Sequence, residues 1–69
     1  MDTYKLTPAQ LESLTRLAQR WELQVSDLLA KSHPESGNPA TACLMVPLGK
    51  DLNNPTLWVG IERDGYAHS

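Results

Sequence analysis

Cysteine and histidine are the side chains with which this chain of 69 residues could do metal or nucleophilic chemistry, and it has few of them. It holds one cysteine, Cys43, and two histidines, His33 and His68. A metal site in a protein normally needs three or four ligands at workable spacing. Because Cys43 falls in the middle of a predicted strand, far along the sequence from both histidines, we expect solvent-exposed histidines and no metal site.

Cys43 is also the only thiol that could act as a nucleophile. A reactive thiol needs a nearby base and an electropositive environment, because the thiolate is the form that attacks. The sequence neighbours of this cysteine are Ala42 and Leu44, which offer neither. The pattern therefore predicts a buried, inert thiol.

The polar segment after position 48 contains residue types that occur in ion-binding loops. Asp51, Asn53 and Asn54 have the composition of a calcium loop, but the bidentate glutamate that such a loop requires is missing. Gly49–Lys50 lacks the preceding glycine frame of a phosphate-binding loop. We interpret the segment as a turn.

Glu62 and Asp64 are the remaining acidic residues that stand close together near a strand end. Two carboxylates form a general acid/base pair only when a pocket gives them different environments, and the sequence shows no such pocket. We therefore expect no catalytic residue, no cofactor and no enzymatic activity.

The element that must organise the rest of the chain is a helical segment over residues 7–32. Thr7 and Gln10 have the spacing of a capping box, in which each side chain bonds the backbone amide of the other residue. Pro8 falls at the first helical position, where its missing N–H costs nothing. These signals predict that the helix begins directly after Thr7.

One face of this segment is apolar. At a step of about 100° per residue, eight apolar side chains fall within an arc of roughly 120°, and Leu23 lies outside it. We expect Trp21, which is on this stripe, to be a core residue. The opposite face is charged and predicted to be solvated. The stripe comprises Leu11, Leu14, Leu17, Ala18, Trp21, Val25, Leu28 and Leu29.

Two interpretations of the helix length stay open. An unbroken helix over residues 8–32 would span about 37 Å, whereas a compact chain of this size has a radius of gyration of about 11 Å. The helix could overhang and pack on a second copy, or break near Glu22–Val25 with Ser26 as a second N-cap. The unbroken stripe and the absence of Gly and Pro favour one helix.

The second half of the chain predicts an antiparallel β-hairpin. Thr41–Leu48 and Thr56–Arg63 are rich in apolar, β-branched and aromatic residues, and the polar segment Gly49–Pro55 separates them. Pro47 has no N–H for the ladder, so we expect it at an edge, a bulge or a strand end. The chain is thus predicted to be one α+β domain over residues 1–69, with a helical segment at 7–32, a loop at 33–39, the hairpin at 40–64 and a tail at 65–69.

Both faces of the predicted hairpin are apolar. Alternation places Ala42, Leu44, Val46, Leu48, Leu57, Val59 and Ile61 on one face, which should pack on the helix. Cys43, Met45 and Trp58 lie on the other face. One helix cannot cover both faces, so either another protein chain or the termini must cover the second. We expect a partner interface formed by Cys43, Met45 and Trp58.

Composition narrows the class of protein and of partner. The net charge of −2 gives no general attraction to nucleic acid or to an anionic membrane. A single cysteine fits a reducing compartment, and the absence of a signal-like or membrane-spanning run predicts a cytoplasmic protein. The expected function is a small, non-catalytic protein–protein interaction module, as a homodimer or as a subunit or regulator of a larger assembly.

Residues 3–29, TYKLTPAQLESLTRLAQRWELQVSDLL, resemble the opening of a ribbon-helix-helix repressor or antitoxin. The resemblance implies a strand over Thr3–Thr7, a first helix over Pro8–Trp21 and a second helix capped by Ser26. The family usually has Gly in the inter-helix turn, where this chain has Glu22.

The ribbon-helix-helix fold is a dimer whose paired strands enter the DNA major groove. Carried over by position, the resemblance implies that Thr3, Lys5 and Thr7 face DNA, while Tyr4 and Leu6 face the core. It therefore implies an alternative function, that of a dimeric DNA-binding regulator or antitoxin.

Overall fold

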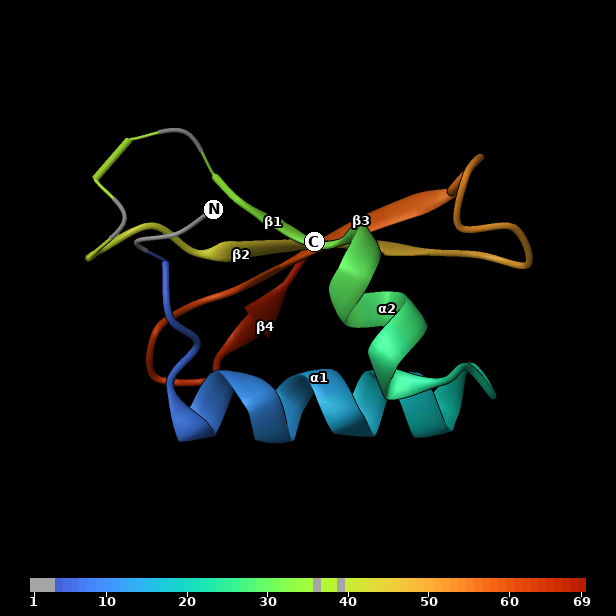
Figure 1. The fold of residues 1–69 in the computed structure, drawn as a ribbon, viewed down its shortest axis with the longest axis horizontal. Helices are drawn as coiled ribbons and strands as arrows, with labels where there is room; N and C mark the ends of the chain where they lie inside the picture. The colour runs from blue at the N-terminus through green and yellow to red at the C-terminus, as the bar shows by residue number, and fades with distance from the viewer. Residues whose placement is uncertain (1–3, 36, 39) are drawn as a thin grey trace.

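The computed structural model describes residues 4–35, 37–38 and 40–69. Within them, two helices pack against one face of a four-stranded antiparallel sheet with strand order β1-β2-β3-β4 (Figure 1). The elements are α1 (Pro8–Arg20), α2 (Val25–Lys31), β1 (His33–Pro34), β2 (Leu44–Leu48), β3 (Leu57–Ile61) and β4 (Ala67–His68). The predicted α+β class is confirmed.

The predicted start of the first helix is confirmed in detail. Thr7 is the N-cap of α1, and Pro8 is its first residue. The Gln10 amide donates to Thr7 Oγ1 at 3.1 Å, and the Thr7 amide donates to Gln10 Oε1 at 3.0 Å. The capping box therefore satisfies two backbone donors that the first helical turn leaves free.

The prediction of one unbroken helix is wrong. Residues 21–24 separate α1 from α2, and Glu22 has φ 57°, in the left-handed region that a helix does not use. The amide of Leu23 donates to Ala18 O at 2.8 Å, which closes the end of α1. The longest dimension of the molecule is 30 Å, so the break allows α2 to turn back toward the sheet (Figure 1). No helix in the described residues has the length and apolar content of a membrane span.

The break also overturns two predictions about single residues. Ser26 is not an N-cap: Gln24 has that position, without a side-chain cap bond, and Ser26 lies inside α2. Trp21 is not a core residue, since it is the C-cap of α1 and 39% exposed. Because the helical phase ends at this cap, Leu23 packs against the core although the stripe excluded it.

The predicted loop and tail both contribute short strands. His33–Pro34 pairs with β2 as β1, and Ala67–His68 pairs with β3 as β4. The two predicted strands are shorter than expected, at Leu44–Leu48 and Leu57–Ile61. The predicted antiparallel hairpin is confirmed as β2 and β3. The expectation that it forms the whole sheet is wrong, because a short strand pairs with each of its outer edges.

Pro47 lies where the sheet has an open edge. It pairs with Trp58 on β3, while the pairing of β1 reaches only to Met45 on the other side of β2. The backbone oxygen of Leu48 points towards β3, where it accepts from the Thr56 amide. Successive residues of a strand direct their backbone groups to opposite sides, so the nitrogen of Pro47 faces the open edge. The predicted edge position of Pro47 is confirmed.

The connection at Asp51 forms the predicted turn, with the Asn53 amide donating to the Asp51 carboxylate at 3.0 Å.

The core lies between the two helices and the inner face of the sheet. The predicted inner-face residues are buried except Leu57, which is 39% exposed at the start of β3. The largest wholly buried apolar side chains of this core are Leu14 from α1, Leu28 from α2, Leu44, Val46 and Leu48 from β2, and Ile61 from β3. Pro47 of β2 is wholly buried as well.

The turn that leads into β4 packs closely on α1. Gly65 has φ 93°, and a Cβ at this position would lie 2.9 Å from the Ala9 carbonyl oxygen. The hydroxyl of Ser13 donates to Gly65 O. Glycine is therefore needed for both the backbone conformation and the close approach, and the contact holds β4 in place beside β3.

Candidate functional site

The sheet face that points away from the helices carries most of the chain's chemically distinctive side chains. In the cross-strand register, His33 lies opposite Met45, Met45 opposite Gly60, and Gly60 opposite His68. Directly opposite residues share a face. The two histidines therefore stand at the two ends of one row that crosses all four strands.

A second row lies beside the first. The Glu35 amide donates to Cys43 O at 2.9 Å, and the Glu62 amide donates to Tyr66 O at 2.8 Å. Cys43 and Glu62 are opposite each other, one step beyond the paired ends of β2 and β3. We call the face formed by these two rows, together with Pro47 and Trp58, the outer face.

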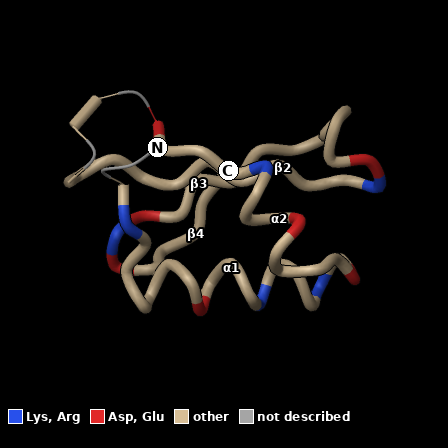
Figure 2. Tube along the Cα trace, in the orientation of Figure 1, with Lys and Arg blue, Asp and Glu red and all other residues tan. Residues whose placement is uncertain are grey.

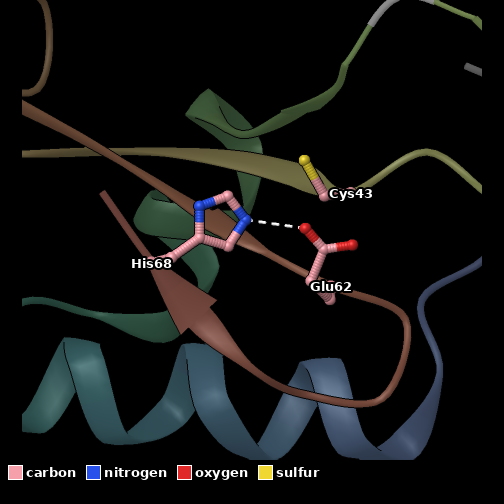
Figure 3. A group of neighbouring side chains, drawn as sticks. All are labelled: Cys43, Glu62 and His68. Carbon is pink, nitrogen blue, oxygen red and sulfur yellow. Dashed lines mark hydrogen bonds and ion pairs between the residues drawn. The ribbon is translucent and has the colours of Figure 1, made fainter.

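Three potential ligands meet on the outer face. Donor atoms of Cys43, Glu62 and His68 all lie within 4.8 Å of one another (Figure 3). His68 Nε2 is 2.6 Å from Glu62 Oε2. Cys43 is 5% exposed, whereas the side chains of His68 and Glu62 are 42% and 44% exposed. The cluster thus has a buried thiol beneath two groups that solvent can reach.

Gly60 makes room for this cluster. A Cβ on Gly60 would lie 3.0 Å from His68 Cε1, 3.1 Å from His68 Nε2 and 3.4 Å from Cys43 Sγ. The imidazole ring therefore occupies the space that a side chain at this position would take, and the thiol borders it. Any larger residue at position 60 would push the ring of His68 away from its present place.

The surroundings of the thiol keep it protonated. Burial, followed by the hydrogen bond and negative charge of Glu35 and the charge of Glu62, raises the pKa of Cys43 from 9.0 to about 11. The thiol donates to Glu35 Oε2 at 3.1 Å and lies 3.8 Å from Met45 Sδ. The predicted burial of Cys43 is confirmed. Its inertness stays a prediction.

That prediction can be tested by alkylation with iodoacetamide at pH 8. We expect the folded protein to react about 100-fold more slowly than the urea-unfolded chain, because a pKa near 11 instead of 9.0 reduces the thiolate fraction by that factor. Glu35→Gln should speed the reaction of the folded protein. Equal rates in the folded and unfolded chains would show that the thiol is neither buried nor perturbed.

The same shift makes stability depend on alkaline pH. The folded state favours the protonated thiol, so its contribution to stability is complete below pH 9.0. The contribution is lost as the pH rises from 9.0 towards about 11, because the unfolded chain releases its thiol proton first.

The structure separates the three residues predicted to form a partner interface. Trp58 is 41% exposed, Met45 is half-buried, and Cys43 is buried within the chain. The ring centroid of Trp58 lies 5.4 Å from that of His33, with the rings tilted. Cys43 therefore offers little surface to a partner, and the predicted interface of the three residues stays a prediction. Both histidines are exposed, as expected.

The residues that the ribbon-helix-helix resemblance assigns to DNA have different surroundings. Thr3 lies outside the described residues, and residues 4–7 form no strand. Lys5 is exposed. Thr7 Oγ1 accepts from Gln10 and donates to Arg63 O at 2.6 Å, so its hydroxyl is already engaged. Tyr4 is buried, and its hydroxyl donates to Ala42 O at 3.1 Å.

Charged residues are dispersed. In the part of the chain that the structure describes, acidic and basic residues follow one another along the trace and do not gather into a broad basic face (Figure 2). This distribution agrees with the net charge of −2. It offers little long-range attraction to a phosphate backbone.

Sequence reasoning missed the cluster because it treated Cys43 and the histidines as separate. One signal was present: in a hairpin with this register, Glu62 must lie opposite Cys43. The position of His68 has no comparable signal, since β4 contains only two residues. No protein-family model matches the chain, and the comparisons with curated proteins and with solved structures give no match.

Proposed function

We propose that this chain is a small, non-catalytic interaction module that pairs with a second copy of itself through the outer face of its sheet. The observation that carries the proposal is the exposure of Trp58. This indole is 41% exposed on a sheet face over which no helix of the described chain lies (Figure 1). A large aromatic side chain in this position is typical of the centre of a protein–protein contact.

The neighbours of Trp58 extend the contact surface. Met45, half-buried on the adjacent strand, adds a flexible apolar side chain, and the ring of His33 lies against the indole. Glu35 and Glu62 lie in the row farther from Trp58. A contact centred on Trp58 would thus place apolar groups at its middle and leave the two carboxylates towards a rim that water reaches.

Size and charge favour a second copy as the partner. The molecule measures 30 × 21 × 21 Å, so one face offers roughly 600 Å² per copy, and a pair buries about 1,200 Å², the lower end for specific interfaces. A net charge of −2 gives only weak repulsion between copies. We infer a reversible homodimer whose population depends on concentration. The free thiol suits a reducing compartment, for which we propose the cytoplasm.

Sedimentation equilibrium from micromolar to millimolar protein tests the homodimer. We expect Trp58→Lys to weaken self-association by at least about 30-fold, because loss of a central aromatic side chain typically costs about 2 kcal/mol or more. Trp21→Lys is the matched control, since Trp21 is equally exposed but lies at the end of α1. It should change the association constant less than about threefold.

Two outcomes would contradict the proposal: a monomer at every concentration, or equal effects of both substitutions.

The order of helix, turn and helix after residue 7 also favours a second candidate function, the DNA-binding regulator. Salt-dependent binding to mixed-sequence duplex DNA that Lys5→Ala weakens would support that function instead. An assembly with a different protein would appear as a monomer that binds no DNA.

A further inference from the structure

We propose that Cys43, Glu62 and His68 bind a single divalent transition-metal ion of the zinc type on the outer face. Three chemically different donors converge there: a sulfur, a carboxylate oxygen and an imidazole nitrogen, all within 4.8 Å of one another. They come from three strand ends that only the folded sheet brings together. The His68 ring and the Glu62 carboxylate point towards each other, and the Cys43 thiol lies beside them (Figure 3). The site lies on the same outer face as the proposed homodimer contact, but all three donors come from one chain, so the site does not rest on that proposal.

The spacing of the donors is close to that of a metal site. Zinc bonds of about 2.0 Å to nitrogen and oxygen and about 2.3 Å to sulfur place tetrahedral donors about 3.3–3.7 Å apart. Donor atoms within 4.8 Å therefore need to move inward by about 1 Å. The hydrogen bond of 2.6 Å between His68 and Glu62 must open to admit the ion. The His68 and Glu62 side chains, which are 42% and 44% exposed, are the groups that would move.

The type of donor selects the metal. Calcium and magnesium prefer oxygen ligands alone, whereas thiolate and imidazole together favour zinc and its neighbours. Glu35, whose carboxylate lies 3.1 Å from Cys43 Sγ, is a further oxygen donor close to the thiol. A thiolate and the Glu62 carboxylate also balance the two positive charges of the ion, so the occupied site would be neutral.

Binding requires the Cys43 thiol to lose its proton. The S–H bond of Cys43 breaks, a zinc–sulfur bond forms, and the proton leaves to solvent. The imidazole of His68 uses the lone pair of Nε2 and keeps its proton on Nδ1. Gly60 contributes by its lack of a side chain, because the imidazole ring lies close to the place of a Cβ. No oxidation or reduction takes place.

Cobalt(II), the usual spectroscopic substitute for zinc, tests the site in protein without a histidine tag. We expect one Co²⁺ per chain, with a thiolate-to-cobalt charge-transfer band and the strong visible bands of a tetrahedral site. Added Zn²⁺ should abolish both signals. Cys43→Ser should remove the charge-transfer band, and Glu62→Gln or His68→Gln should weaken binding at least about tenfold. Circular dichroism of each variant without metal verifies that it is folded.

His33→Gln is the matched control, because His33 stands in the same row as His68 but at the opposite end. It should leave the spectrum and the affinity unchanged. Trp58→Lys should also retain one Co²⁺ per chain, so failure of the homodimer does not remove the metal site. Absence of the charge-transfer band in the folded protein, or loss of binding through His33→Gln alone, would overturn the proposal.

Discussion

Leu14→Ala is expected to lower the free energy of unfolding by about 3–4 kcal/mol, which is the usual cost of truncating a wholly buried leucine. Leu14 is the largest wholly buried side chain of α1, and it belongs to the core cluster between the helices and the sheet. Its removal would leave a cavity that the short helices and the sheet can fill only in part.

This loss is large for such a small domain. A chain of this length has a total stability of about 3–10 kcal/mol, so the variant should be substantially unfolded at 37 °C. Urea denaturation followed by circular dichroism measures the change. Leu11→Ala is the control, because Leu11 is on the same helix but 46% exposed, and it should cost less than about 1 kcal/mol. Equal costs would mean that α1 does not cover the sheet.

Gln10→Leu is expected to be nearly as damaging, although leucine fits the same volume and is a good helix former. The Gln10 side chain is wholly buried and acts as a polar link between α1 and the sheet. Its Nε2 donates to Tyr4 Oη at 2.8 Å and to Ile61 O at 3.1 Å. Its Oε1 accepts from the Thr7 amide at 3.0 Å and from Arg63 at 3.3 Å.

Replacing this amide by an apolar side chain removes four hydrogen bonds at once, although the Tyr4 hydroxyl keeps its bond to Ala42 O and Arg63 keeps its bond to Lys5 O. Each buried polar group that loses its partner costs about 1–3 kcal/mol, and the capping box loses the bond from the Thr7 amide to the Gln10 side chain. We expect a total loss of about 2–4 kcal/mol in the same urea experiment. Gln19→Leu, at an exposed position of the same helix, should change stability by no more than about 0.5 kcal/mol. Similar small effects at both positions would show that the network contributes nothing to stability.

Gln10 also shows how far sequence patterns reach. Thr7, Pro8 and Gln10 predicted the first residue of α1 correctly, because a capping box acts over four consecutive residues. The inner face of β2 and β3 was also predicted correctly, apart from Leu57 at the strand end, because the alternation of side chains between the two faces is likewise a local property of the strand. The capping pattern did not predict that the Gln10 amide also bonds Ile61 and Arg63, more than fifty residues away.

What only the tertiary structure decided involves groups that are distant in sequence. The break at Glu22 carries no Gly or Pro; it follows from fitting two helical segments onto a molecule 30 Å long. The strands β1 and β4 have two residues each, too few for a periodic signal, and they exist because β2 and β3 offer them edges to pair with. The pairing of β4 places His68 beside Cys43 and Glu62. The local sequence therefore determined the helix start, the hairpin and the burial of the thiol, whereas long-range strand pairing assembled the cluster around it.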